Sequence, residues 1–359
     1  MARQTDMDRL HVIAPNFKRR LSGVTSTIIQ LVPLQARRVG IATLGPGLPD
    51  TLPHLRWTQL PALWRRPADR MPRVWHARRN TEMLAGVVLR DALRMPLRLV
   101  FTSASQRHHS RWTKFLVSRM DAVIATSRRT AAYLEVPNRV VMHGIDTARF
   151  RPADDRRQAR GAAGLDPAKK YAGCFGRIRH QKGTDLFVDA MIALLPENPG
   201  WEAIVAGRTT SEHAGFEREL RARIEAAGLA SRIRFVGEHR DIERWYRALD
   251  LFVAPQRWEG FGLTPLEAMA SGVPVVASDV GAFSELVAEG RTGEIVARDD
   301  LAALTAAIAA RLGDEALLAT EGQAARAHVE AGFRLEGEAA ALNAVYAALR
   351  SAGPGRAQA

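Results

Sequence analysis

Short apolar segments rich in β-forming residues alternate with segments of helical periodicity along almost the whole chain. This alternation is typical of β-α-β units, in which crossover helices join parallel strands. It predicts an α/β fold built of two doubly wound, Rossmann-like domains. The expected strands span 10–14, 38–43, 73–75, 97–102, 121–125 and 139–142 in the first half, and 171–175, 202–206, 232–236, 251–254 and 273–277 in the second.

The chain length of 359 residues suits two domains. A charged segment with helix breakers begins at Arg151, so we expect a first domain over 1–150 and a second over 151–333. A terminal helix is predicted over 334–350 and a disordered tail over 351–359. Ligands of open parallel sheets bind beyond the carboxyl ends of the strands, so we expect the chemistry in a cleft that the two domains face.

Positive charge is concentrated in the first half of the chain. Residues 1–150 contain 25 Lys and Arg against 9 Asp and Glu, a net charge of +16, whereas residues 151–359 carry −3. Such asymmetry indicates an anionic partner of the first domain, such as nucleic acid, an acidic membrane surface or a phosphorylated substrate. The start of the chain has no signal-peptide pattern, no run is apolar enough to span a membrane, and Cys174 is the single cysteine. We therefore expect a cytoplasmic protein.

The segment 251–278 (LFVAPQRWEGFGLTPLEAMASGVPVVAS) carries the strongest motif. Glycines between a strand and a helix let backbone N–H groups approach a ligand, and the start of a helix favours anions, as in a nucleotide-linked diphosphate. Glu267, one turn into the helix, can accept hydrogen bonds from a ribose, and Glu259 in the loop from a sugar hydroxyl. The alternative is a helix start whose acidic residues are favoured by the helix dipole alone.

The segment 173–187 (GCFGRIRHQKGTDLF) is a second strand, loop and helix start. Arg177 and Lys182 lie in its loop, where they can neutralise a diphosphate without a metal. Lys182 precedes Gly183, so this is not the Walker A order of residues. A solvated basic loop is the alternative interpretation.

Polar and basic side chains also follow the expected strands of the first half. The segment 74–83 (VWHARRNTEM) leads from a strand into a helix, so His76 and Glu82 can face the cleft, and His76 can hydrogen-bond the reacting sugar. A strand-end histidine and a solvated basic face remain the alternatives. The candidates for binding an anionic acceptor are Lys18, Arg19, Arg78, Asn80, His108 and Arg111.

The two motif segments resemble the retaining glycosyltransferases of the GT-B fold, in particular the large family 4. The family's E-x7-E signature matches Glu259 and Glu267, and its preceding Arg/Lys pair matches Arg177 and Lys182. The first-half strings RLSGVTSTI, VWHARRNTEM and VFTSASQRHHS are most similar to bacterial lipopolysaccharide core mannosyltransferases. The resemblance extends over nearly the whole chain and implies that the helix 334–350 returns to the first domain.

The resemblance implies catalytic roles for Arg177, Lys182 and Glu259, with Glu267 on the ribose of the donor. His76 joins this catalytic set because of its position at a strand end. It implies a metal-independent transfer of a hexose, mannose from GDP-mannose, to the acidic inner core of lipopolysaccharide. The chain departs from the family at Ser22-Gly23 and Gly281-Ala282, where relatives have glycine pairs. Further donor contacts are implied for Gly23, Gly260, Phe261, Gly262 and Leu263.

Other functions remain open at this point. The donor can instead be another nucleotide sugar such as UDP-glucose, or the enzyme can be a nucleotide-sugar epimerase or hydrolase. A nucleic-acid-binding protein is less favoured because no helix-turn-helix, RNP or zinc pattern is present. We expect neither a metal nor a resident cofactor. The basic first domain and a lipid-linked acceptor predict peripheral association with the inner face of the membrane.

Overall fold

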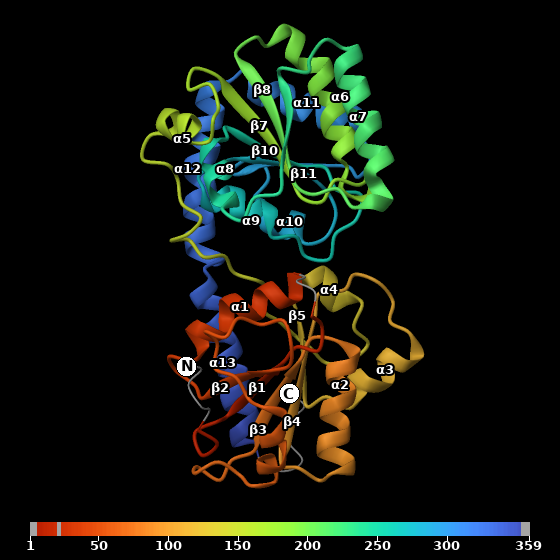
Figure 1. The fold of residues 1–359 in the computed structure, drawn as a ribbon, viewed down its shortest axis with the longest axis vertical. Coiled ribbons are helices and arrows are strands. Elements are labelled where there is room, and N and C mark those ends of the chain that lie inside the picture. The colour runs from red at the N-terminus through yellow and green to blue at the C-terminus, as the bar shows by residue number, and fades with distance from the viewer. Residues whose placement is uncertain (1–5, 20–22, 353–359) are drawn as a thin grey trace. The chain divides into compact units, whose positions relative to one another are not determined.

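The computed structural model describes residues 6–19 and 23–352 of the chain, which form two compact units (Figure 1). Unit 1 comprises Met1–Gly144 and Leu335–Ala359, and unit 2 comprises Ile145–Arg334. Each unit is a parallel six-stranded sheet covered by helices, so the chain has the doubly wound α/β architecture predicted from its sequence.

The division between the units falls at residue 144, six positions before the boundary expected from the sequence. Ile145 N donates to Phe333 O at 2.8 Å, and Arg326 donates to the carbonyl oxygens of Thr147 and Phe150. These bonds hold the segment 145–150 on unit 2. The helix at the carboxyl end continues to Ser351, and the expected tail beyond Ala352 lies outside the described residues.

The sheet of unit 1 has strand order β2-β1-β3-β4-β5-β6. Every residue of β1, β2 and β3 is buried, as expected for parallel strands covered on both faces. Their bounds are β1 Val12–Pro15, β2 Ile41–Leu44, β3 Arg73–Ala77, β4 Leu97–Ser103, β5 Ala122–Ala125 and β6 Arg139–Val140.

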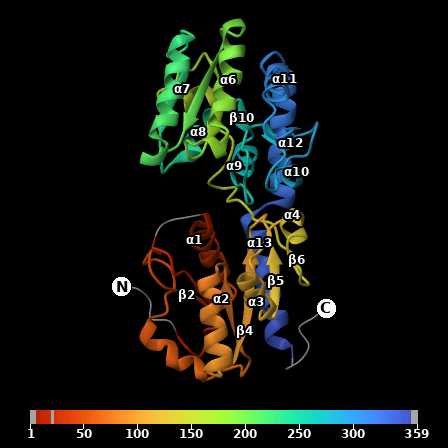
Figure 2. The same cartoon turned by 90° about the vertical axis from the view of Figure 1, so that its right-hand side faces the viewer.

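The helices of unit 1 form two layers around this sheet (Figures 1 and 2). One core cluster joins the sheet to η1, α2 and α3, and a second joins it to α1 and α13. The bounds are α1 Gly23–Gln35, the 3-10 helix η1 Trp57–Trp64, α2 Asn80–Val87, its π-helical continuation η2 Val88–Ala92, α3 Arg111–Ser118, α4 Arg128–Ala132 and α13 Leu335–Ser351.

The sheet of unit 2 has strand order β12-β11-β10-β7-β8-β9. The last of these strands in the chain, Gly293–Val296, was missed in the sequence because its four residues are framed by glycine and charged residues rather than by an apolar run. The bounds are β7 Lys170–Phe175, β8 Trp201–Ala206, β9 Ile233–Gly237, β10 Leu251–Ala254, β11 Val275–Ser278 and β12 Gly293–Val296.

Several helices of unit 2 begin at an aspartate whose side chain accepts a backbone N–H of the first turn, as Asp155, Asp300 and Asp314 do. The α-helices are α5 Arg156–Ala162, α6 Thr184–Leu194, α7 Ala214–Ala226, α8 Ile242–Ala248, α9 Thr264–Ala270, α10 Phe283–Leu286, α11 Leu301–Leu312 and α12 Glu315–Gly332. Short 3-10 helices are η3 His180–Lys182, η4 Leu195–Glu197 and η5 Ser211–His213.

Among the described residues, no helix is both long and apolar enough to cross a lipid bilayer.

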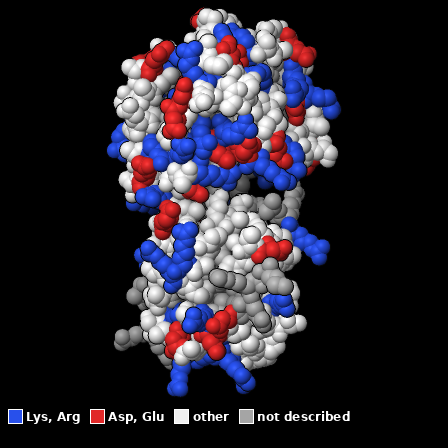
Figure 3. Space-filling view, turned by 60° about the vertical axis from the view of Figure 1, so that its left-hand side comes forward, with Lys and Arg blue, Asp and Glu red and all other residues white. Residues whose placement is uncertain are grey.

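Charged side chains differ in their distribution between the two units. On the face drawn in Figure 3, Lys and Arg are interspersed with Asp and Glu over unit 2, in keeping with the small net charge of that part of the chain. Many of these charges form ion pairs, such as Arg223 with Asp189 and Glu219. The positive excess of the sequence therefore lies in unit 1.

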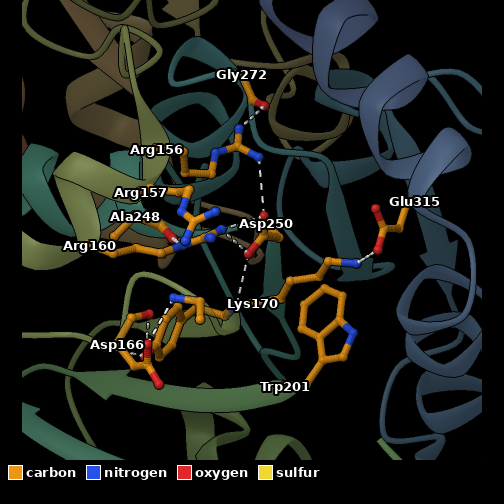
Figure 4. A network of polar contacts seen from close by, with 12 residues as sticks. Arg156, Arg157, Arg160, Asp166, Lys170, Trp201, Ala248, Asp250, Gly272 and Glu315 are labelled. Carbon is orange, nitrogen blue, oxygen red and sulfur yellow. Dashed lines mark hydrogen bonds and ion pairs between the residues drawn. The ribbon is translucent and has the colours of Figure 1, made fainter. Parts of the chain in front are cut away.

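A buried ion pair joins α5 to the sheet of unit 2 (Figure 4). Asp250, next to β10, accepts from Arg160 Nη2 at 2.7 and 2.6 Å and from the backbone N of Tyr171 at 2.8 Å. Arg156 adds a longer contact of 3.3 Å. The Arg160 side chain is only 8% exposed, so removal of Asp250 would leave a buried guanidinium without its counter-ion, bonded to the carbonyl oxygen of Ala248.

We expect Asp250→Ala to lower the free energy of unfolding of unit 2 by about 3–5 kcal/mol, the usual cost of breaking a buried ion pair from one side. Urea denaturation followed by far-UV circular dichroism measures the change. Asp154→Ala is the control, because Asp154 is 90% exposed in its pair with Arg151 and should contribute nothing measurable. Equal stabilities of the two variants would contradict the assignment.

Candidate functional site

The two motif segments of unit 2 meet where the order of its strands reverses. The chain runs from β7 outward through β8 and β9, then returns to place β10 on the other side of β7. At such a switch point the loops after the two central strands separate and leave room for a ligand. The loop with Lys182 follows β7, and the loop with Glu259 follows β10.

Gly183 brings these two loops into contact. Its φ of +67° belongs to the left-handed region, and a Cβ atom at this position would lie 1.8 Å from the carbonyl oxygen of Pro255. Any other residue would push the loops apart, because a main-chain oxygen cannot yield as a side chain can. The glycine noted in the sequence as the start of α6 therefore also sets the separation of the two loops.

Lys182 and Glu259 form an ion pair across these loops, although 77 positions separate them in the sequence. Each side chain keeps 19% of its surface exposed, so the pair is shielded but remains accessible. The second carboxylate oxygen of Glu259 accepts from Gly260 N at 3.0 Å. The structure thus joins two residues that the sequence placed in separate motifs.

The glycine frame around Glu259 has a steric cause. Gly262 has a φ of +88°, and a Cβ there would lie 2.2 Å from Phe283 Cε1. Gly281 has a φ of +60°, and a Cβ would lie 3.0 Å from that of Glu259. Ala282 has an ordinary φ of −95°, so the alanine that replaces a glycine of the family introduces no strain. Its N–H donates to the carbonyl oxygen of the buried Phe261 at 3.1 Å.

Glu267 lies in the first turn of α9, which begins directly after Leu263. Its Oε2 accepts from the hydroxyl of Tyr246 at 2.8 Å, and Tyr246 is fully buried on α8. Burial raises the pKa of Glu267, although the hydrogen bond from Tyr246 acts in the opposite direction. Burial and the neighbouring Glu267 carboxylate raise the pKa of Tyr246 well above its usual value. Tyr246 orients Glu267, a contact that no signal in the sequence predicted.

Arg177 lies in the loop directly after β7 and is exposed. Within residues 6–19 and 23–352 it makes no hydrogen bond or ion pair. Burial and the charge of Arg177 lower the pKa of the neighbouring Arg179.

Among residues 6–19 and 23–352, no three His, Cys, Asp or Glu side chains gather closely enough to hold a metal ion.

Arg257 ties the two loops together more extensively than any residue predicted from the sequence. Its guanidinium donates to both oxygens of Asp185 at 2.7 and 2.8 Å, to the carbonyl oxygen of His180 at 2.7 Å and to Asp299 at 2.7 Å. Its backbone N donates to Gln181 O at 3.0 Å. Arg257 lies two residues before Glu259, and His180 and Gln181 directly precede Lys182. The clamp therefore sets the distance between the two predicted site residues, and no local pattern reveals a pair 72 positions apart.

In unit 1 the structure corrects the expectation for His76. The side chain is fully buried, its Nδ1 lies 2.6 Å from the hydroxyl of Tyr346 and its Nε2 lies 2.7 Å from that of Thr102. Burial and the nearby Arg78 hold the pKa of His76 well below its usual value, so the ring is neutral. Both ring nitrogens contact hydroxyl groups inside the domain, so neither nitrogen of His76 is free to bind a sugar.

Glu82 was also expected to face the cleft but is completely buried. It pairs with Arg79 at 2.6 Å and accepts from the backbone N of Arg78 at 2.8 Å. Arg79 donates in turn to Asn16 at 2.8 Å, directly after β1. The switch point of the unit 1 sheet lies between β1 and β3. The side chains of this network, which belong to unit 1 itself, occupy it.

The acceptor candidates lie beyond the carboxyl ends of β1, β3 and β4, which are adjacent strands. Asn80 donates to Thr113 at 2.8 Å, and the ring of His108 lies edge to face with Tyr133 at 5.4 Å. Gly23 opens α1, where a Cβ would meet no described atom within 4 Å, and the preceding Ser22 lies outside the described residues. Lys18, Arg19, His108 and Arg111 are exposed, and Arg78 is partly buried.

Comparison with known proteins identifies the family of the chain. The family model described as glycosyl transferases group 1 matches residues 169–314. The lipopolysaccharide core biosynthesis mannosyltransferase LpsB of Rhizobium meliloti (strain 1021) is 65% identical over 96% of this chain and 99% of its own length. The corresponding enzyme LpcC of Rhizobium leguminosarum bv. viciae is 58% identical over 96% of this chain and 98% of its own.

Among solved structures, Anabaena Alr3699/HepE in complex with UDP superimposes with a TM-score of 0.82 at 20% identity, over 95% of this chain and 100% of that one. The fold and the two relatives together define an enzyme of the glycosyltransferase class with the GT-B fold. The chain belongs to the glycosyl transferases group 1 family and, within it, to the lipopolysaccharide core mannosyltransferases.

We expect Arg257→Ala to lower kcat/KM about 100-fold, because a displacement of about 1 Å at a reacting centre has that effect. Arg257→Lys keeps the positive charge but loses the bidentate contact with the two carboxylate oxygens of Asp185, so its activity should be intermediate. Steady-state kinetics, with thermal melting to verify folding, test this order. Arg244→Ala removes an exposed pair on α8 and serves as the control. Wild-type kinetics in a folded Arg257→Ala would disprove the positioning role.

The raised pKa of Glu267 predicts a pH dependence of donor binding. As the pH falls through that pKa, the carboxylate gains a proton and loses an acceptor for ribose hydroxyls, so affinity should decrease towards acid pH. Titration calorimetry with a nucleotide sugar between mildly acid and neutral pH measures the slope. Glu267→Gln should bind more weakly and without that slope. An unchanged slope in this variant would assign the titration to another group.

Proposed function

We propose that the chain transfers mannose from GDP-mannose to the inner core of lipopolysaccharide, with retention of configuration and without a metal or a resident cofactor. Support comes from the two relatives named as lipopolysaccharide core mannosyltransferases, which align over nearly their whole lengths. The observation that carries the proposal is the meeting of Lys182 and Glu259 at the switch point of unit 2.

The diphosphate of the donor binds in this proposal beside Arg177 and Lys182. An ammonium has three N–H donors, so Lys182 can bind Glu259 with one and phosphate oxygens with the others. Arg177, exposed at the end of β7, adds a second positive charge. Preorganised cations of this kind stabilise the charge that develops on a leaving diphosphate, and they act more strongly where water is excluded.

The sugar and ribose are held by the two glutamates. Glu259, oriented by Lys182 and Gly260 N, accepts a hydroxyl of the mannose. Glu267, oriented by Tyr246, accepts the ribose hydroxyls with its remaining oxygen. The loop residues Phe261 to Leu263 provide backbone N–H groups at the donor, where Gly262 allows a close approach of the main chain.

The reaction begins with cleavage of the bond between the anomeric carbon and the diphosphate oxygen. The acceptor hydroxyl attacks the face that the diphosphate leaves, and its proton passes to the departing phosphate oxygen, which is the base on that face. Configuration is therefore retained without a covalent enzyme intermediate. The residues of unit 2 hold the charge of the leaving group throughout this step.

The acceptor and the membrane lie on the side of unit 1 in this proposal. Lys18, Arg19, Arg78 and Arg111 offer positive charge and bidentate donors to the anionic groups of a lipopolysaccharide core. A protein acting on a lipid-linked substrate would associate peripherally with the inner leaflet, which attracts basic surfaces. No nucleic acid is needed as a partner.

A panel of GDP- and UDP-sugars, assayed with a chelator present, tests the donor and the metal independence together. Release of nucleoside diphosphate is measured with and without deacylated lipopolysaccharide core. Release of GDP from GDP-mannose only when the core is added would support the proposal. Turnover of UDP-glucose would identify a different donor. Consumption of the nucleotide sugar without acceptor would indicate an epimerase or hydrolase. Loss of activity with chelator would overturn metal independence.

We expect Lys182→Ala to lower kcat by about 10²–10³, the usual cost of removing one preorganised charge-stabilising group. The fold should be kept, because Lys182 lies in a partly exposed loop. The matched control is Lys169→Ala, which removes a surface lysine bonded to Pro199 O just before β7 and should leave kcat unchanged. Turnover close to wild type in Lys182→Ala would refute the leaving-group role.

A further inference from the structure

One layer of unit 1 carries an unusual share of exposed apolar side chains. The layer consists of η1, the continuous helix α2–η2, and α3, which pack on the same face of the sheet through one core cluster. Trp112 and Phe115 on α3 are 50% and 52% exposed, and Trp57 on η1 is 53% exposed. The full set on this layer is Trp57, Trp64, Leu84, Val88, Leu93, Trp112 and Phe115.

Internal contacts account for part of this set, because Trp57 lies 5.6 Å from the ring of Phe17 and Trp64 donates to the main chain. They do not account for the two aromatic side chains of α3. On α3, Thr113, Leu116 and Val117 face the core, whereas Trp112 and Phe115 point away from it and stack on each other with ring centroids 5.7 Å apart. A short surface helix normally presents polar residues on its outer face. A group of exposed aromatic and aliphatic side chains of this kind favours a contact with another molecule or with a membrane.

Polar contacts between the three elements make the layer continuous. Trp64 Nε1 donates to Leu93 O at 2.7 Å and so joins η1 to the end of η2. Arg90 Nη2 donates to Arg119 O at 2.9 Å and joins η2 to the end of α3, as Asn80 and Thr113 do at the other end of the two helices. Figures 1 and 2 both show α2 and α3 next to each other.

The charge of the same layer is strongly positive. The segments 56–66 and 107–119 contain no Asp or Glu. On α2 and η2, Glu82 is buried with Arg79, and Asp91 is paired with Arg90 and Arg119. Lys114 is paired with Glu135 at 2.5 Å. Further exposed cations flank the apolar side chains: Arg56, Arg65, Arg66, Arg94, Arg107 and Arg111.

We propose that the outer face of η1, α2–η2 and α3 is a docking surface for an anionic lipid bilayer, with Trp112 and Phe115 inserted at the level of the headgroups. The inference deepens the peripheral association proposed above and assigns it to named residues. Tryptophan and phenylalanine insert at the boundary of headgroups and acyl chains, and surrounding arginines bind anionic headgroups. The combination of apolar area with positive charge favours an anionic bilayer over an uncharged protein partner.

Sedimentation of the full chain with vesicles tests the surface. The vesicles contain phosphatidylglycerol and phosphatidylcholine in equal amounts, or phosphatidylcholine alone. We expect binding to the anionic vesicles, weakened by salt, and at least about tenfold weaker partitioning of the double variant Trp112→Ser/Phe115→Ser. The matched control Val140→Ser removes an exposed apolar side chain of unit 1 outside the layer and should bind as the wild type does.

Glycosyl transfer to the water-soluble, deacylated core is measured in parallel for each variant. Trp112→Ser/Phe115→Ser should retain that activity, because neither side chain belongs to the proposed donor or acceptor sites, and this result also verifies its fold. Vesicle binding without transfer to any core acceptor would overturn the proposed function and leave the surface standing. The two proposals therefore fail separately.

Three results would overturn the docking surface. The first is equal binding of the wild type and the double variant to anionic vesicles. The second is a lack of wild-type binding to these vesicles even at low salt. The third is a dimer of the wild type, detected by analytical ultracentrifugation, that dissociates in the double variant, together with an absence of vesicle binding. A second copy of the chain would then cover the face.

Discussion

The contact between the loops after β7 and β10 is the constraint on which the candidate site depends. Gly183 allows the main chain to pass Pro255 O at a distance that no Cβ tolerates, and Arg257 holds both loops through Asp185 and His180 O. Only this arrangement lets Lys182 reach Glu259. The chemistry of the site therefore depends on backbone packing as much as on the two charged residues themselves.

The two sheets use their switch points differently. In unit 2, the point between β7 and β10 keeps a partly exposed ion pair that can exchange contacts with a ligand. In unit 1, the corresponding point between β1 and β3 is closed by Arg79, which bonds to both Glu82 and Asn16. The same topology thus supports an accessible charged pair in one domain and a structural network in the other.

The charge of the first half has two consequences, and Arg111 contributes to both. Some basic side chains follow the carboxyl ends of β1, β3 and β4, where an acceptor is expected, and others surround the exposed aromatics of η1 and α3. A net charge counted along the sequence cannot distinguish these groups, because both consist mainly of arginine. The distinction comes from which elements share a face of the sheet.

The sequence by itself determined the α/β class, nearly all the strands and the two motifs around Lys182 and Glu259, because periodicity and glycine spacing are local properties. It missed β12, whose residues lack an apolar run, and it placed His76 at the sugar although both ring nitrogens bond to Tyr346 and Thr102. Tertiary structure alone decided the pairing of Lys182 with Glu259, the Arg257 clamp and the support of Glu267 by Tyr246. These contacts join residues 21 to 77 positions apart, and only the folded sheet brings such positions together.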